Sequence, residues 1–407
     1  MQSGFPAPTG FAARRDRVSA AGYLASATPL RLAMGGATVA IPILAVEELN
    51  DIALGGLLVA AALAPAVVAA PLVGAVLDRT RRPRGMMALA GAVAAVGLGG
   101  GALLGILPTV IVALALCAAG AAGPFFMGGL SSFVTEEIRD ERRAYALDAL
   151  SYNLGSVGGP AIVAAAAAIG SARSAMVAMA VAALVGVAGT LATRLTPRPL
   201  HSASIWRTMG AGLQHIALHR PLAVVTTSGT ISQLGGGALS VAAVVLAIER
   251  VGDADDGAIV VSAFAIGGLI GAVLTAARPG RLRPDLSMGV GFAAIGVLTL
   301  VAAVDWGFAW TVALIGLSGL FTASSSAAML LLRKQQSPAR LRGQVFTVGA
   351  GLRATAAAVG AALAGAAVGL GGTALILGIG AIWVLSGLLM VAYPRRAEEL
   401  DTGPVRV

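Results

Sequence analysis

Long apolar stretches, each long enough to cross a lipid bilayer as a helix, recur along almost the whole chain. A membrane-spanning helix needs about 20 apolar residues, and the sequence offers roughly a dozen such stretches. Hydrophobic residues make up 57% of the chain and charged residues only 12%, which is more apolar side chain than a soluble protein can bury. Because lipid offers no water to unpaired backbone groups, the spans must be helices. The sequence therefore predicts an all-α integral membrane protein.

Polar segments divide the apolar sequence into twelve predicted spans. Their limits are 19–46, 52–77, 86–106, 109–134, 145–170, 173–193, 221–248, 257–277, 286–304, 307–332, 344–369 and 373–393. The longest polar connection separates six spans from six. We therefore expect a cytoplasmic N-terminus (1–18), an N-terminal six-helix bundle (19–193), a cytoplasmic central linker (194–220), a C-terminal six-helix bundle (221–393) and a cytoplasmic tail (394–407).

Basic residues gather on one side of the predicted spans. The net charge is +9, from 28 Lys and Arg against 19 Asp and Glu. Arginines concentrate at the chain ends and in every second loop, and only Arg31, Arg173 and Arg250 clearly fall elsewhere. The opposite loops are acidic, with Glu47, Glu48, Asp51, Glu249, Asp253, Asp255, Asp256 and Asp305. This positive-inside bias predicts cytoplasmic termini, and no motif suggests that the charge serves nucleic-acid binding.

One short segment occurs twice. Gly74-Ala75-Val76-Leu77 returns as Gly271-Ala272-Val273-Leu274, 197 positions later, and an Arg-rich turn follows each copy. Each predicted half contains an even number of spans, so both halves enter the membrane from the same side. The pattern therefore predicts parallel repeats related by a pseudo-two-fold axis along the membrane normal.

The turn after the first copy resembles the loop between helices 2 and 3 of the major facilitator superfamily, which reads Gly-x-x-x-Asp-Arg-x-Gly-Arg-Arg. Gly74, Asp78, Arg79 and Arg82 match that pattern, Arg81 stands at the family's Gly, and Pro83 replaces an Arg. The resemblance covers about residues 15–395 and implies the family's fold and alternating-access transport. It also implies that the Asp78 cluster closes the cytoplasmic side. The alternative is a plain basic turn that only obeys topology.

A second segment is similar to the family's helix 5 motif, Gly-x-x-x-Gly-Pro. Gly155, Gly159 and Pro160 match it, although Val163 and Ala164 replace the trailing Gly pair. In the family this motif accompanies exporters of the antiporter type, which implies a conformational role for these residues. The helix 4 arginine of proton-coupled members is absent, since Leu116 occupies its position. The general character of the chain, including Leu218-His219-Arg220-Pro221, is similar to an actinobacterial exporter-like branch of the family. The Ala- and Arg-rich, nearly Lys-free composition fits a high-GC bacterium, so we expect a bacterial inner-membrane protein.

Arg31 is the sharpest candidate for a substrate contact, because it lies about midway along the first span. A charge within the membrane is costly and normally faces a cavity or a partner, and the resemblance places helix 1 beside the central cavity. The alternative is that the span begins later and Arg31 reaches the cytoplasmic headgroups. Two further candidate substrate contacts are Asn153 in the fifth span and Gln233 beside a run of three glycines in the seventh.

Asp148 and an aromatic cluster are weaker candidates. Asp148, near the start of the fifth span, is a candidate proton carrier, but it equally fits a loop charge network with Arg142 and Arg143. Phe126 and Met127 in the fourth span suit a hydrophobic ligand because such side chains are apolar and adaptable. Ordinary packing in the core or against lipid explains them as well.

Enzyme and metal signatures are absent from the sequence. It contains no Gly-x-Ser-x-Gly, Gly-x-Gly-x-x-Gly or Walker A motif. His215 and His219 have helical spacing for a metal but no third ligand nearby, and the single Cys117 allows no disulfide within the chain. We therefore expect no catalytic residues, no metal and no cofactor.

The sequence thus predicts a secondary active transporter that moves a small organic solute by alternating access. We expect a monomeric, proton-coupled exporter of drugs or metabolites, surrounded by membrane lipid. One alternative is an importer or uniporter of a polar or anionic metabolite that uses Arg31. An alternative of another class is a membrane sensor or scaffold that transports nothing.

Overall fold

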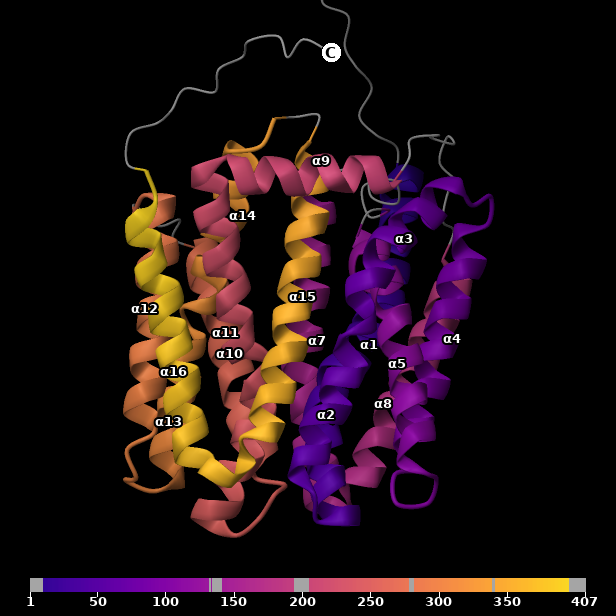
Figure 1. Cartoon of the computed structure of the whole chain (residues 1–407). Coiled ribbons are helices and arrows are strands. Elements are labelled where there is room, and N and C mark those ends of the chain that lie inside the picture. Colours follow the sequence, from indigo (N-terminus) through magenta and orange to yellow (C-terminus); the bar gives the residue numbers. More distant parts are fainter. Residues whose placement is uncertain are drawn as a thin grey trace, which may run out of the picture.

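The computed structural model describes residues 10–131, 133, 141–193, 205–277, 282–338 and 341–394, and the described residues form helices and turns without a β-strand. Twelve of the helical segments are long and apolar enough to cross a membrane. This confirms the predicted number of spans and the all-α fold class. Figure 1 shows the spans running roughly parallel to one another.

Five helices and two helix pairs make up the N-terminal half and the linker. They are α1 (Gly10–Leu49), α2 (Ile52–Leu63) with α3 (Pro65–Arg79), α4 (Pro83–Gly101), α5 (Thr109–Pro124) with the π-helix η1 (Phe125–Gly129), α7 (Glu141–Ile169), α8 (Ala172–Ala192) and α9 (Ile205–Leu218). The predicted second span is divided between α2 and α3 because Pro65 lacks a backbone N–H and begins a new helix.

The C-terminal half has the same order of spans. It consists of α10 (Arg220–Val251), α11 (Gly257–Ala277), α12 (Pro284–Ala302), α13 (Phe308–Gly319) with α14 (Thr322–Gln335), α15 (Arg342–Ala366) and α16 (Gly372–Leu389), with short 3-10 turns η2 (Val368–Leu370) and η3 (Met390–Ala392). Proline at the first or second helical position begins α4, α10 and α12, where its missing N–H costs nothing.

Helix α9 lies across one end of the spans (Figure 1), which we call the linker end. The opposite end, with the turns 50–51, 170–171, 252–256 and 370–371, is the far end. Ile216 of α9 packs with Leu222 and Val345 in a small hydrophobic cluster, and His219 Nε2 lies 3.0 Å from Gln336 Oε1. The apolar face of α9 is thereby attached to the C-terminal half.

Small residues let the spans approach at backbone distance. A Cβ added to Gly189 would lie 2.4 Å from the Ala25 carbonyl oxygen, and one added to Gly360 would lie 2.0 Å from that of Leu234. Such contacts hold membrane helices together by van der Waals packing, because burial against lipid-like side chains provides little driving force. Large side chains such as Val96 and Val110 instead remain exposed on the outer surface, as expected of a surface that faces lipid.

The far end contains the clearest sign of a structural repeat. The Glu47 carboxylate, at the end of α1, accepts hydrogen bonds from the Ala172 N–H at 3.0 and 2.9 Å. In the other half, Glu249 of α10 accepts one from the Gly372 N–H at 2.7 Å. The first helix of each half therefore caps the N-terminus of the last, where a carboxylate also meets the positive end of the helix dipole.

Candidate substrate pathway between the two halves

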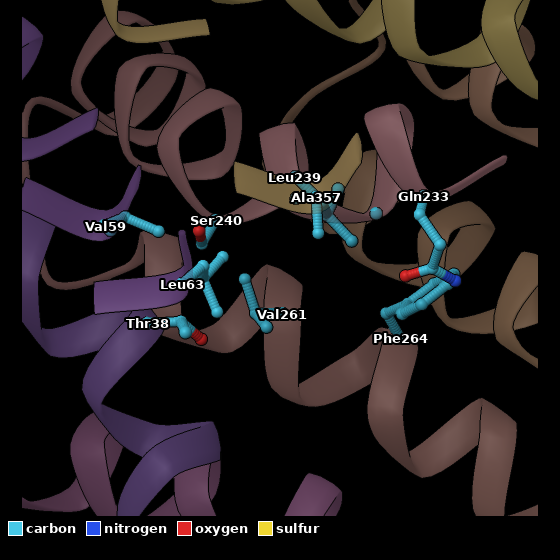
Figure 2. Close-up of a pocket in the computed structure, with 11 residues that line it drawn as sticks. Thr38, Val59, Leu63, Gln233, Leu239, Ser240, Val261, Phe264 and Ala357 are labelled. Carbon is cyan, nitrogen blue, oxygen red and sulfur yellow. The ribbon is translucent and has the colours of Figure 1, made fainter. Parts of the chain in front are cut away.

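A cavity of about 190 Å³ lies between the two halves of the chain. Its lining residues come from α1, α2, α10, α11 and α15, namely Thr38, Val59, Leu63, Gln233, Gly236, Gly237, Leu239, Ser240, Val261, Phe264 and Ala357. Figure 2 shows Thr38, Val59 and Leu63 at one end of this central cavity and Gln233 beside Phe264 at the other. A solute held here would touch both halves at once.

The central cavity is mainly apolar, with a few polar groups. Val59, Leu63 and Val261 supply aliphatic surface, and the Phe264 ring stacks on Trp383 with 5.7 Å between ring centroids. Gln233 contributes an amide. Apolar walls with a few placed polar groups are typical of sites for small organic molecules.

At the far end, α2 and α15 meet without a side chain between them. A Cβ added to Gly56 would lie 2.6 Å from the Gly365 Cα and 2.8 Å from the Ala361 carbonyl oxygen. These residues belong to opposite halves of the chain. The contact therefore brings the two halves together on the far-end side of the cavity.

Arg31 is buried, with 2% of its surface exposed, and protein groups surround its guanidinium. Its Nη2 lies 2.8 Å from Asp148 Oδ1 and donates to Ser131 Oγ at 2.8 Å. Its Nη1 donates to the Ser151 hydroxyl, and the guanidinium carbon lies 3.6 Å from the centroid of the Tyr152 ring. The charge that the first span carries into the membrane is therefore paired inside the N-terminal half.

The π-helix η1 completes the environment of Arg31. Pro124 immediately precedes η1 and cannot donate a backbone hydrogen bond, and π-helical turns commonly occur at functional sites. Here the carbonyls of Phe126 and Met127 accept hydrogen bonds from Arg31 Nε at 3.4 Å and Nη2 at 3.2 Å. These two residues thus contact Arg31 through their backbone.

Of the predicted substrate contacts, Gln233 lines the central cavity, whereas Arg31, Asn153, Phe126 and Met127 are not among its lining residues. The Phe126 side chain is fully buried in the N-terminal hydrophobic core. Asn153 donates from Nδ2 to the Ala149 carbonyl of its own helix at 2.9 Å. A substrate-binding role stays a prediction for all five residues.

The helix 5 motif forms the interface between α1 and α7. A Cβ on Gly155 would lie 2.8 Å from Arg31 Cβ, and one on Gly159 would lie 2.5 Å from the Gly36 nitrogen. Pro160, the next residue, is buried within α7. The two glycines therefore allow α1 to lie directly on α7, which explains the small residues without assigning them a conformational role.

The predicted gate at the end of α3 is only partly described. Gly74, Asp78 and Arg79 belong to α3, but their side-chain environments lie outside the described residues, as do those of Arg142 and Arg143. Arg82 is exposed in the turn before α4, where its N–H donates to Thr80 Oγ1 at 3.1 Å. The gating role therefore stays a prediction.

Asp148 accepts hydrogen bonds from groups other than Arg142 and Arg143, the partners that the sequence suggested for it. Besides Arg31, its carboxylate accepts hydrogen bonds from the Tyr23 hydroxyl and from Ser131 Oγ, the latter at 2.9 Å. These groups come from α1, from the segment after η1 and from α7. Asp148 thereby connects three membrane segments of the N-terminal half.

Two arginines in the C-terminal half were missed by the sequence analysis. Arg353 lies inside the predicted span 344–369, so the statement that only Arg31, Arg173 and Arg250 fall outside the basic loops was wrong. Arg333 was assigned to a basic loop but is only 1% exposed and lies in the last turn of α14. The apolar run Leu330-Leu331-Leu332 before it was the available signal.

Comparisons with known proteins identify the family. A family model described as Major Facilitator Superfamily matches residues 24–275, while no curated protein matches the chain. Among solved structures, the nucleoside transporter NupG has a TM-score of 0.75 at 14% identity, covering 91% of this chain and 98% of its own. A bacterial homolog of the human lysosomal transporter Spinster, inward-facing and unoccupied, has a TM-score of 0.73 at 13% identity, covering 95% and 98%.

The peptide transporter POT in complex with alafosfalin has a TM-score of 0.69 at 16% identity and covers 92% of this chain and 93% of its own. At such identities these structures show the fold alone. The family match covers more than half of the chain. The protein therefore belongs to the Major Facilitator Superfamily of membrane transporters.

Proposed function

We propose that this protein exports a small organic solute across the bacterial inner membrane by alternating access, coupled to the proton gradient. The observation that carries this proposal is the central cavity, because helices of both halves line it. A site between two bundles becomes accessible to either side of the membrane when the bundles rock against each other. In this proposal the units that rock are the predicted N-terminal and C-terminal six-helix bundles.

The charge distribution supports a cytoplasmic linker end. Acidic side chains such as Glu47, Glu249 and Asp255 lie at the far end, whereas Arg333 and Lys334 lie in the last turn of α14 toward the linker end. Basic residues favour the cytoplasmic side of bacterial membranes. The Gly56–Gly365 contact then closes the extracellular side, leaving the cavity to be loaded from the cytoplasm.

Asp148 is the proposed proton carrier. Protonation of its carboxylate would remove the charge that neutralises Arg31, 2.8 Å away. The groups around it would have to rearrange, because Arg31 also bonds to the segment after α5 and to α7. A proton arriving at Asp148 would thereby change the packing of three membrane segments.

Transport by inside-out membrane vesicles tests the proposal. Vesicles containing the protein are energised so that their lumen is acidic, then incubated with a panel of amphipathic drugs, organic anions, amino acids and sugars. We expect at least one compound to accumulate in the lumen. The Gly236→Trp variant should abolish this uptake, because Gly236 lines the cavity. Apart from the local helix backbone, the nearest atom to a Cβ added at Gly236 would be Gln233 Oε1, 3.5 Å away.

The matched control is Gly378→Trp, since an added Cβ at that exposed α16 position meets nothing within 4 Å. If no compound accumulates, or if both variants behave alike, the transport proposal fails. Proton coupling is tested separately with a protonophore and with Asp148→Asn, which should retain solute exchange but lose its dependence on the pH gradient. Unchanged pH dependence in that variant would remove Asp148 from the mechanism.

A further inference from the structure

Arg333 carries a buried charge that no described residue neutralises. Its side chain is 1% exposed, and neither Nε nor Nη2 has a hydrogen-bond partner among the residues that the structure describes. The guanidinium lies against the backbone of α15, since a Cβ added to Gly349 would be 2.7 Å from Nη1 and 2.9 Å from Cζ. An isolated buried charge costs several kcal/mol, by order-of-magnitude estimates, unless it is paired.

A second arginine lies next to it. Arg353 is one helical turn beyond Gly349 on α15 and is half-buried, and its buried Nε has no partner in the described part of the chain. The positive charge of Arg353 is close enough to Arg333 to oppose the charge on its guanidinium. No ion pair to either arginine occurs among the described residues. Two neighbouring positive charges therefore repel each other here, and no described side chain supplies a counterion.

Arg31 provides the internal comparison. It is equally buried, yet its guanidinium is paired with Asp148 and bonds to hydroxyl and carbonyl oxygens. A buried arginine that serves structure is saturated in this way. Arg333 and Arg353 lack that saturation, which indicates that their partner is not part of the described chain.

The two arginines lie on the linker-end side of the central cavity, beside helices that line it. Ala357, Arg353 and Gly349 follow one another at four-residue intervals on α15, so they share one helix face. The first lines the cavity, and the last touches Arg333. On α10, the cavity residue Gln233 is one turn from Gly229, where an added Cβ would lie 3.6 Å from Arg333 Nη2.

We propose that Arg333 and Arg353 bind the anionic group, a carboxylate or phosphate, of the transported solute, while its apolar remainder occupies the central cavity. This inference rests on the proposed transport function and names its substrate class as amphipathic organic anions. Guanidinium groups suit such a partner because their planar N–H pairs bind carboxylate and phosphate oxygens in bidentate fashion. Export also agrees with the charge, since a cell interior that is electrically negative drives anions outward.

Binding of matched probes tests the site. Purified protein in a neutral detergent is titrated with 2-naphthoate and naphthyl phosphate, and with the uncharged 2-naphthamide as the isosteric control. We expect at least one anion to bind and the amide to bind at least about tenfold more weakly. Arg333→Gln and Arg353→Gln should each weaken anion binding about tenfold or more. The neighbouring exposed cation serves as control, and Lys334→Gln should leave binding unchanged.

A stability measurement separates a binding role from a structural one. Without ligand, Arg333→Gln should melt at the same temperature as the wild type or higher, because it removes a buried charge that no described residue pairs. A clearly lower melting temperature with anion binding intact would overturn the proposal, as would equal binding of naphthamide. If only phosphatidylglycerol in nanodiscs, and no soluble anion, protects the protein in an Arg333-dependent way, the partner is a lipid headgroup and the substrate assignment is wrong.

Transport assays keep this inference distinct from the general proposal. If the vesicles accumulate uncharged or cationic compounds in a manner blocked by Gly236→Trp but unaffected by Arg333→Gln and Arg353→Gln, the transport function holds and the anion site is refuted. If no compound is transported while the anion still binds through the two arginines, the site holds and the transport proposal fails.

Discussion

Arg31 of α1 and Asp148 of α7 form an ion pair inside the membrane, with 2.8 Å between Nη2 and Oδ1. The exposed fractions of their side chains are only 1% and 15%, so water screens the pair little. Gly155, two turns from Asp148, lets the same two helices approach at backbone distance. Charge pairing and close packing therefore act on one interface, and removing either should destabilise the whole N-terminal half.

The ion pair predicts strong coupling between its two partners. Arg31→Met should lower the free energy of unfolding by about 3–5 kcal/mol, because it leaves the Asp148 carboxylate buried and unpaired. The double variant Arg31→Met/Asp148→Leu should recover much of that loss. Melting temperatures in detergent provide the measurement. The control is Arg283→Met, because the Arg283 side chain is 56% exposed in its ion pair with Asp285. Exposed ion pairs contribute about 0–1 kcal/mol to stability. A double variant no more stable than the single one would contradict strong coupling.

The helix caps formed by Glu47 and Glu249 at the far end predict two equivalent losses of stability. Glu47→Ala and Glu249→Ala should each destabilise the protein by about 1–2 kcal/mol, because each leaves N-terminal amides of α8 or α16 without an acceptor. Asp253→Ala should matter little, since Asp253 lies exposed in the loop between α10 and α11 and takes part in no ion pair among the described residues. Differential scanning calorimetry compares the three variants. A large loss for one glutamate and none for the other would argue against an equivalent role in the two halves.

The Gly56–Gly365 contact predicts a conformational effect. Gly56→Val places atoms where α15 now lies, and this overpacking costs about 1–3 kcal/mol. The population of the state in which the far end is open should therefore rise by about 5- to 150-fold. Labelling of Thr38→Cys in a Cys117→Ala background, with an impermeant maleimide added at the far end, should accelerate accordingly. Gly378→Val is the control, because an added Cβ there meets nothing within 4 Å. An unchanged labelling rate in Gly56→Val would show that the contact does not close this side.

Asp255, in the far-end loop between α10 and α11, predicts a pH dependence of stability. Burial raises the pKa of its carboxyl from 3.8 to about 6, aided by the negative charges of Glu47, Asp253 and Asp256. Because the pKa of the Asp255 carboxyl is raised in the folded state, this group contributes its full stability below about pH 4. That contribution is lost as the pH rises through about 6. Asp255→Asn should therefore raise the melting temperature at pH 8 and have less effect at pH 5.

The control for this pH series is Asp305→Asn, which removes an exposed carboxylate of the same end of the molecule. Its difference from the wild type should stay constant between pH 5 and pH 8. A constant difference for Asp255→Asn as well would mean that the Asp255 carboxyl has an ordinary pKa in the folded protein.

The sequence by itself determined the twelve spans, the all-α class and the family, because hydrophobic length and short motifs are local properties. It also singled out Arg31, since a charge within an apolar run is visible without a structure. The sequence could not show whether that charge faces a solute or a protein partner. It also did not draw attention to Arg353, because small residues dominate the span in which Arg353 lies. The pairing of Arg31 with Asp148 joins residues that lie 117 positions apart in the chain.

Tertiary structure alone decided which arginines are neutralised and where the cavity lies. Thr38, Gln233 and Ala357 come from three helices of two halves and share a cavity only because those helices pack together. The contrast between Arg31, which is paired, and Arg333, which no described residue pairs, likewise arises from neighbours distant in sequence. Span length and composition depend on each residue's own transfer from water to lipid, whereas pairing and cavity shape depend on which residues the packed helices bring within a few ångströms.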